Sequence, residues 1–279
     1  NLREMDVLVS TGEQVTIALL CMALHEAGIE ARSYTGGQVR ILTDKSHGKA
    51  RIQEIDGHRI KDDLDAGKVV VVAGFQGADD AGNITTLGRG GSDTTAVALA
   101  AALEADECQI YTDVDGVYTT DPRVVPEARR LKSITFEEML ELASQGAKVL
   151  QTRSVELAMR KKTKLSVRSS IKPSASGTVI TDENNVLENN TVSGIAFSRD
   201  EAKITLSKVL DKPGVSSKIF GPLAKGNVNV DMILQNISQD GKYANLSFTL
   251  PRQDIDKAIK IIKREIKPHC GFILNYIFQ

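Results

Sequence analysis

Apolar residues recur at helical spacing near the start of the chain. The pattern predicts a helix from Glu13 to about Ala27, and Gly28 follows it as a natural C-cap. Short apolar runs at Ile29–Tyr34 and Val39–Thr43 favour strands. Val69–Val72 is an unbroken β-branched run, which is typical of a strand buried on both faces of a sheet.

The middle of the chain alternates strands and helices. A glycine-rich stretch, Gly88–Asp93, follows the Val69–Val72 strand and leads into an alanine-rich helix that ends near Ala105. Cys108–Thr112 is then predicted as a strand. This order is typical of βαβ units in a largely parallel sheet. The other predicted elements are helices at Arg59–Ala66, Ser133–Ser144 (with Ser133 as N-cap) and Ala147–Lys161, and strands at Leu165–Ser169 and Thr178–Thr181.

A polar, Asn-rich stretch without periodicity, Asp182–Asn190, separates two patterns. We therefore predict one domain over residues 1–184 and a second over 191–279. The second pattern is a βαββαβ unit, the ferredoxin-like arrangement. Its predicted elements are Val192–Val209, Val215–Lys225, Val228–Ile237, Tyr243–Leu250, Ile255–Ile266 and Gly271–Ile277.

Composition excludes several classes of protein. The 279 residues carry 35 basic and 36 acidic side chains, a net charge of -1, so we expect no recruitment of nucleic acid or anionic lipid. Apolar runs such as Ala96–Leu103 fall short of the roughly 20 residues that span a bilayer, and no signal peptide opens the chain. We therefore expect a cytoplasmic protein without a membrane partner. Cys21, Cys108 and Cys270 are widely spaced, which favours reduced core thiols over disulfides or a metal site.

The strongest candidate site is the Gly88–Asp93 stretch. The P-loop, zincin and complete Rossmann patterns are absent from the sequence, so a nucleotide would be held another way. Adjacent glycines let successive backbone N–H groups face one concavity, and the following helix adds its positive N-terminus, so the stretch favours an anion. Arg89 supplies a planar fork for a carboxylate. The alternative, that Ser92 or Asp93 only caps the helix, stays open on spacing alone.

The second candidate is Tyr111–Arg123, which begins at the carboxyl end of a predicted strand. In open α/β sheets that edge is where ligands bind. Asp113 and Asp115 resemble the start of a calcium loop, but the later ligand positions are missing, which argues against calcium. Asp121-Pro122 taken alone would be a plain turn.

Two single charged residues also open predicted helices. Glu13 follows Ser10-Thr11-Gly12, and a carboxylate there ordinarily complements the helix dipole. Lys148 follows Gly146, where a cation is mildly unfavourable, so a bound phosphate would explain it better than stability would. A solvated lysine is the alternative for Lys148.

Five segments in order and spacing resemble the motifs of aspartokinases. They are Ser10–Glu13, Val72–Gly77, Leu87–Asp93, Tyr111–Arg123 and Lys148–Leu150. Several long motifs in register are far more specific than any one of them. The βαββαβ unit, with Asp211–Gly214 and Asn229–Met232, is similar to the first ACT module of that family.

The resemblance implies an amino-acid-kinase fold of α/β type, with a sheet between helices, followed by an ACT domain. It implies an enzyme that uses ATP and Mg²⁺ to phosphorylate the side-chain carboxylate of L-aspartate, the first step of lysine, threonine and methionine biosynthesis. Two alternatives stay open. One is a catalytically incomplete effector-binding subunit or fragment, and the other is a different amino-acid kinase.

The resemblance also implies roles for single residues. L-Aspartate would be bound by Glu13, Arg89, Gly90, Gly91 and Ser92, and the catalytic residues would be Asp93, Arg89 and Lys148. ATP would be bound by Thr112, Asp113, Tyr118, Thr119, Thr120, Asp121, Pro122, Arg123 and Lys148. Lysine or threonine would be the effector, bound between ACT domains of a homo-oligomer by Asp211, Ser216, Asn229, Val230, Asp231 and Gln235.

Two departures from the family pattern concern the extent of the chain. The family's opening Lys-Phe-Gly-Gly segment, whose lysine neutralises the transferring phosphoryl group, is absent from the sequence, and one ACT unit stands where the family usually has two. The chain also opens on Asn1 without an initiator methionine. We therefore expect these residues to be a fragment that aggregates or is nearly inactive alone.

Overall fold

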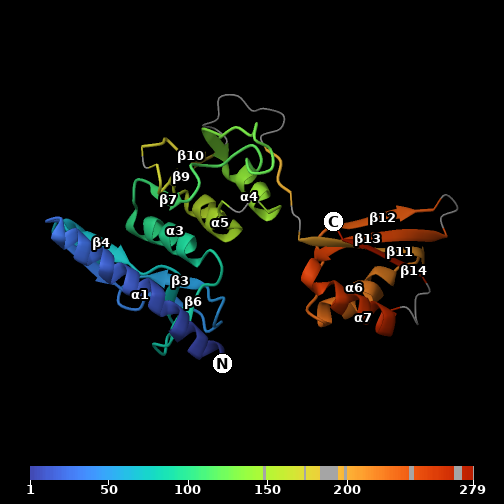
Figure 1. Ribbon diagram of the computed structural model, residues 1–279. Coiled ribbons are helices and arrows are strands. Elements are labelled where there is room, and N and C mark those ends of the chain that lie inside the picture. The colour runs from blue at the N-terminus through green and yellow to red at the C-terminus, as the bar shows by residue number, and fades with distance from the viewer. Residues whose placement is uncertain are drawn as a thin grey trace. The chain divides into compact units, whose positions relative to one another are not determined.

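The chain divides into two compact units, Asn1–Phe197 and Ser198–Gln279 (Figure 1). The computed structural model describes residues 1–146, 149–172, 174–182, 194–197, 200–238, 242–266 and 272–278. The predicted domain limits, 1–184 and 191–279, stay a prediction, because residues 183–193 lie outside that set.

Helix α1 (Leu2–Glu26) begins well before the predicted Glu13. Asn1 caps it by accepting a hydrogen bond from the backbone N–H of Arg3 at 3.1 Å. The side chains that α1 buries along one face are Asp6, Ser10, Ile17 and Cys21. Because Asp6 and Ser10 are polar, they interrupt the apolar spacing, and the first turns could not be recognised from the pattern.

The outer face of α1 is apolar and exposed. Leu2, Leu8, Leu19 and Met22 are each between 60% and 67% exposed. By length and composition α1 is the one helix, among those that the structure describes, that could cross a membrane, with a mean hydropathy of 1.7. A core helix and a signal sequence pass the same test, so the finding is weak evidence. It corrects the expectation that every apolar segment is too short, and the absence of a membrane partner stays a prediction.

The described part of the first unit forms three sheets, which combine parallel and antiparallel pairs. In the first, β1 (Ala31–Tyr34) pairs in parallel with β4 (Val69–Val72). The second has the order β3-β2-β5-β6, made of β2 (Ile41–Thr43), β3 (Ile52–Ile55), β5 (Gln76–Ala78) and β6 (Ile84–Thr86). The third has the order β7-β9-β10-β8, made of β7 (Cys108–Thr112), β8 (Ser133–Thr135), β9 (Leu165–Ser169) and β10 (Thr178–Thr181).

The Val69–Val72 run is not buried on both faces, contrary to the prediction. Val69 is 41% exposed, and the three valines that follow it are half-buried. Within the described residues β1 is the one strand that pairs with β4, and helices α1 and α2 (His58–Asp65) contact it. The β-branched run made the strand recognisable, but its partners decide its burial.

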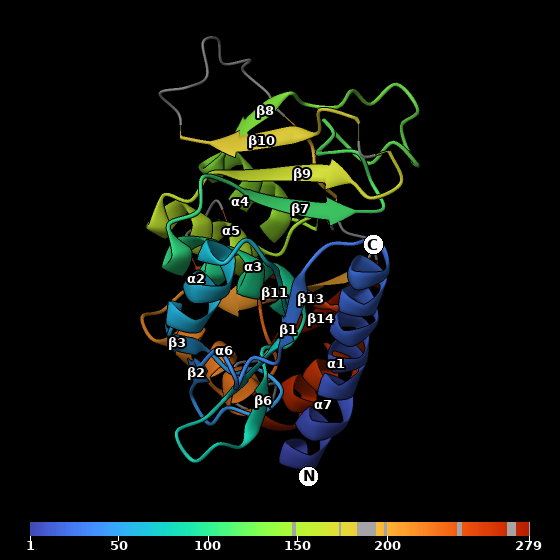
Figure 2. The same cartoon turned by 90° about the vertical axis from the view of Figure 1, so that its left-hand side faces the viewer.

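Three helices gather against the third sheet (Figure 2): α3 (Gly91–Leu103), α4 (Phe136–Ser144) and α5 (Thr152–Lys161). Their shared core includes Val97, Ile110, Met139, Val155 and Leu165, which are buried. The N-cap of α4 is Thr135, which forms a capping box with Glu138, and not Ser133, which lies in β8. Helix α5 begins at Thr152, later than the predicted Ala147, and residues 147 and 148 are not described.

The second unit has the predicted βαββαβ order. Its elements are β11 (Glu201–Leu210), α6 (Val215–Lys225), β12 (Ile233–Ile237), β13 (Tyr243–Pro251), α7 (Ile255–Ile261) and β14 (Ile273–Phe278), with a π-helical turn at Ile262–Ile266 after α7. The sheet is antiparallel, in the order β12-β13-β11-β14, and buries Ile204, Leu206 and Phe248 against the helices. Strand β11 begins at Glu201 rather than Val192, and β12 at Ile233 rather than Val228.

Candidate active site

The glycine-rich stretch forms a tight turn between β6 and α3. Gly88 and Gly90 have φ angles of +78° and +70°, which favour glycine. The Gly91 N–H donates to the Gly88 carbonyl at 3.0 Å. Gly90 is the N-cap of α3 and no side chain caps this helix, so neither Ser92 nor Asp93 is the cap. Since the Gly91 N–H closes the turn, the backbone amides of Ser92 and Asp93 are the ones left to hold an anion.

Three segments that are distant in sequence meet at this turn. The hydroxyl of Ser92 lies 3.5 Å from the Glu13 carboxylate on α1, the outer limit of a hydrogen bond. Gly74 lies under the start of α3, where an added Cβ would be 3.2 Å from the Ser92 Cα. The structure thus brings together the predicted substrate residues Glu13 and Ser92.

Arg89 is exposed at the tip of the turn. It makes no hydrogen bond or ion pair with any residue that the structure describes. A guanidinium without a partner, next to an uncapped helix N-terminus, can hold a carboxylate in two hydrogen bonds.

Asp93 is half-buried in the first turn of α3. Burial raises the pKa of its carboxyl above the ordinary value. Behind it, burial and then the negative charges of Asp93 and Glu107 raise the pKa of the Cys108 thiol to about 11. Cys108 and Cys21 are free and buried, as predicted, and Cys270 lies outside the described residues. The Asp93 carboxyl, whose pKa is raised by burial and which lies beside an anion-binding turn, is a candidate functional group.

Thr112 ends the strand β7 and Asp113 directly follows it, at the predicted ligand edge. The Thr112 hydroxyl donates to the Asp113 carboxylate at 3.0 Å. Ser170, directly after β9, donates its backbone N–H to the Thr112 carbonyl at 2.8 Å. The carboxyl ends of two parallel strands therefore meet here, which suits ligand binding. Ser170 was missed by the sequence reasoning, and its only signal was its place at a strand end.

The side chains of the loop after β7 bond mainly to one another. Arg123 donates to Asp121 through Nε at 3.0 Å and Nη2 at 2.9 Å, and the Val124 N–H closes a turn onto the Asp121 carbonyl at 3.0 Å. The Tyr118 hydroxyl donates to Asp115 at 2.8 Å.

Within the same loop, the Thr119 hydroxyl accepts the Arg129 N–H at 3.1 Å, Thr120 is half-buried and Pro122 is exposed. Lys148 lies outside the described residues. The roles of Tyr118–Arg123 and of Lys148 toward ATP therefore stay predictions.

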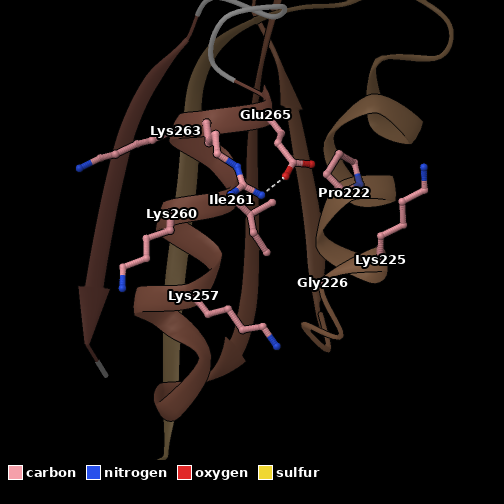
Figure 3. Close-up of a pocket in the computed structure, with 9 residues that line it drawn as sticks. Pro222, Lys225, Gly226, Lys257, Lys260, Ile261, Lys263 and Glu265 are labelled. Atoms are coloured by element: carbon pink, nitrogen blue, oxygen red, sulfur yellow. Dashed lines mark hydrogen bonds and ion pairs between the residues drawn. The ribbon is translucent and has the colours of Figure 1, made fainter.

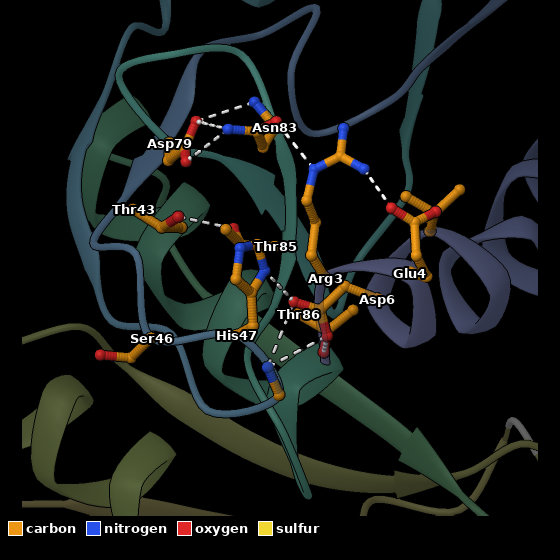
Figure 4. Close-up of polar contacts among 12 residues, drawn as sticks. Arg3, Glu4, Asp6, Thr43, Ser46, His47, Asp79, Asn83, Thr85 and Thr86 are labelled. Atoms are coloured by element: carbon orange, nitrogen blue, oxygen red, sulfur yellow. Dashed lines mark hydrogen bonds and ion pairs between the residues drawn. The ribbon is translucent and has the colours of Figure 1, made fainter. Parts of the chain in front are cut away.

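A buried carboxylate on α1 also supports the turn, and the sequence reasoning missed it (Figure 4). Asp6 is 1% exposed. It accepts hydrogen bonds from the Thr86 hydroxyl at 2.6 Å and the Gly48 N–H at 3.0 Å, and it lies 2.7 Å from Nδ1 of His47. Thr86 directly precedes Leu87, so Asp6 joins α1 to the residues that lead into the glycine turn. Asp6 is one of several charged residues of α1, such as Glu4 and Glu13, so the sequence carried no signal that singled it out.

In the second unit, two predicted effector residues lie together. The Gln235 side chain donates to the Asp211 carboxylate at 3.2 Å. Gly214, with φ +86°, is the N-cap of α6, and no side chain caps that helix. Ser216 is exposed in its first turn.

The remaining predicted effector residues precede β12 instead of lying in it. Asn229 and Asp231 are exposed, Val230 is half-buried, and the Asp231 N–H donates to the Thr249 carbonyl at 3.0 Å. The predicted strand start at Val228 was wrong because the Val228 N–H donates to the Leu223 carbonyl in the turn that ends α6.

A basic depression lies between α6 and the segment formed by α7 and the π-helical turn that follows it (Figure 3). Lys257, Lys260 and Lys263 point in different directions, and Arg264 pairs with Glu265. An anion site needs donors that converge, so this surface has the character of a solvated helical face.

Comparison with known proteins agrees with the fold. The model of the amino acid kinase family matches residues 1–169, and that of the ACT domain matches residues 207–266. An aspartate kinase of Pseudomonas putida (strain KT2440) is 63% identical over 262 residues, 94% of this chain and 63% of that protein. This chain thus spans less than two thirds of that relative's length.

Two solved structures of E. coli aspartokinase III are also similar. One is in complex with lysine and aspartate (32% identical), the other with aspartate and ADP (31% identical). Each has a TM-score of 0.78 and covers 99% of this chain and 62% of that chain. The expected resemblance to aspartokinases and the expected fold are confirmed. With more than half of its residues matched by the family model, the chain belongs to the amino acid kinase family.

Proposed function

We propose that the protein is an aspartate kinase, which transfers the γ-phosphoryl group of ATP to the side-chain carboxylate of L-aspartate. The observation that carries the proposal is Arg89, exposed beside the uncapped start of α3 and without a partner among the described residues. The Glu13 carboxylate lies 3.5 Å from the hydroxyl of Ser92, three residues after Arg89, so a cation-binding and an anion-binding group belong to the same turn. The names of the similar kinases support the same substrate.

The residues of the site divide the work on L-aspartate. Arg89 would hold the α-carboxylate, and Glu13 would accept from the ammonium group. An oxygen of the side-chain carboxylate attacks the γ-phosphorus while the bond to the bridging oxygen of ADP breaks. The amides of Ser92 and Asp93 would neutralise charge on the phosphoryl oxygens, and the Asp93 side chain would position the reacting groups. No protein nucleophile is needed.

ATP would lie at the carboxyl ends of β7 and β9, beside Thr112 and Asp113, with Tyr118–Arg123 and Lys148 completing its site.

Among the described residues no group of three or more His, Cys, Asp or Glu side chains could hold a metal ion. Mg²⁺ needs no such group, because it is ordinarily bound by substrate phosphates and one or two carboxylates, and Asp93 would supply a carboxylate here. When bound, the ion neutralises phosphate charge.

The test is an assay of the full-length protein with ATP and Mg²⁺. We expect release of ADP that depends on L-aspartate, and trapping of the acyl phosphate by hydroxylamine as aspartyl hydroxamate. L-Glutamate at the same concentration is the control. Turnover of glutamate alone would instead identify a different amino-acid kinase, and binding of lysine or threonine without any turnover would identify an effector-binding subunit.

We also propose that lysine or threonine binds the ACT unit of a homo-oligomer and inhibits the kinase. Asp211, Gln235 and the uncapped start of α6 present acceptors for an ammonium group and donors for a carboxylate. Strand β12 is an edge strand whose Leu234 and Ile237 are 50% and 60% exposed, which suits pairing with a second copy.

Asp211→Ala should raise the effector concentration needed for half-inhibition by about tenfold, since a charged hydrogen bond to the ligand is lost. Inhibition of the full-length enzyme by lysine and by threonine, separately and together, measures it. Asp256→Ala, an exposed aspartate on α7, is the matched control. Unchanged inhibition in Asp211→Ala would show that the effector binds elsewhere.

A further inference from the structure

Arg153, in the first turn of α5, joins two distant segments through its guanidinium. Nη1 donates to the Leu87 carbonyl at 3.1 Å, and Nη2 donates to the Ala50 carbonyl at 2.9 Å. Leu87 is 2% exposed and Ala50 is fully buried. One side chain therefore ties α5 both to the residue that precedes the glycine turn and to the segment before β3.

No carboxylate of the described residues forms an ion pair with Arg153. Burial, and then the positive charge of Arg51, lower its pKa below the ordinary value for arginine. The negative charge of Asp44 opposes these two effects only in part. A half-buried cation whose hydrogen bonds all go to backbone carbonyls is costly for folding stability. The planar guanidinium holds the Leu87 and Ala50 carbonyls at a defined spacing, so its contribution is to fix the positions of these two segments.

The neighbours of the turn are close on both sides of Arg89. A Cβ added at Gly88 would lie 2.9 Å from the Gly48 carbonyl oxygen, and one added at Gly90 would overlap the Gln151 side chain, which precedes α5. The Ala50 N–H also donates to the Thr86 carbonyl at 2.9 Å. The backbone before and after Arg89 is thus set against the 48–50 segment and against the start of α5.

We propose that Arg153 is a positioning residue for the reaction: it holds the glycine turn where Arg89 meets the α-carboxylate of L-aspartate. This inference rests on the proposed function. Arg153 acts through the Leu87 carbonyl and touches neither substrate. A shift of the turn by about 1 Å is enough to weaken a two-point contact severely, with losses of up to about a hundredfold.

The first test compares Arg153→Gln, Arg153→Lys and Arg160→Gln in the full-length protein. Arg160 lies on the same helix, is exposed, and pairs only weakly with Glu156 at 3.5 Å. In Arg153→Gln we expect KM for aspartate to rise about tenfold while KM for ATP stays within about twofold. Arg153→Lys should fall between this variant and wild type, because an ammonium group can reach one carbonyl but not both. Arg160→Gln should match wild type. Equal increases of both KM values, or no change in either, would overturn the proposal.

The second test does not depend on the substrate. Hydrogen exchange reports the amides of Leu87, Gly91 and Thr94, which donate to the carbonyls of Phe75, Gly88 and Gly90. Arg153→Gln should speed their exchange severalfold, and Arg160→Gln should not. If wild type fails to phosphorylate aspartate yet these amides respond, the proposed function is wrong and the positioning of the turn stands. Unchanged exchange at these amides would refute the positioning role whatever the substrate.

Discussion

Arg89→Lys should weaken the binding of L-aspartate by about 1.5 to 3 kcal/mol and change the affinity for ATP little. The substitution keeps the positive charge but removes the planar pair of donors. Arg89 is exposed and has no partner among the described residues. The substitution should therefore lower the affinity for L-aspartate and leave the folding stability unchanged.

Isothermal titration calorimetry of the full-length protein measures both affinities. Arg160→Lys, an exposed arginine outside the site, serves as the matched control and should bind aspartate as wild type does. An unchanged aspartate affinity in Arg89→Lys would remove Arg89 from the substrate site. The proposed position of the α-carboxylate would then be wrong.

Asp6→Ala should lower the free energy of unfolding of the first unit by about 3 kcal/mol. The carboxylate is buried, and its removal leaves the Thr86 hydroxyl, the Gly48 N–H and the His47 ring without their acceptor. Burying such groups unpaired costs more than the hydrogen bonds themselves contribute.

Urea denaturation of the full-length protein, with hydrogen exchange to assign the transition to the first unit, measures the loss. Asp6→Asn retains one oxygen acceptor and should lose less than Asp6→Ala. Glu26→Ala, an exposed carboxylate at the other end of α1, should change the stability by less than about 0.5 kcal/mol. A loss in Asp6→Ala no larger than that of Glu26→Ala would contradict the structural role of Asp6.

Most of the candidate site was predictable because its signals are local. The glycines at positions 88 and 90 indicated a turn with left-handed backbone, and the strand Cys108–Thr112 indicated a ligand edge at Thr112. The Asp211–Gly214 turn likewise preceded the expected helix. Such features depend on residues that are close to one another along the sequence, so they can be recognised from the sequence pattern.

The errors arose where distant residues decide local structure. The start of α1 was missed because Asp6 and Ser10 look like breaks in an apolar pattern until their partners are known. The cap of α4 was misplaced because Ser133 pairs into the third sheet beside β10, leaving Thr135 to begin the helix.

The sequence by itself determined the order of most helices and strands, the βαββαβ unit and the glycine turn with Arg89 at its tip, but it missed the short strands β3, β5, β6 and β8. The features that it determined follow from hydrophobic periodicity and from glycine conformations, which are local properties. Only the tertiary structure decided that Asp6, 80 residues from Thr86, and Arg153, 66 residues from Leu87, hold that turn in place. The reason is physical: a hydrogen bond between distant segments exists only once packing has brought them within about 3 Å, and no spacing along the chain encodes it.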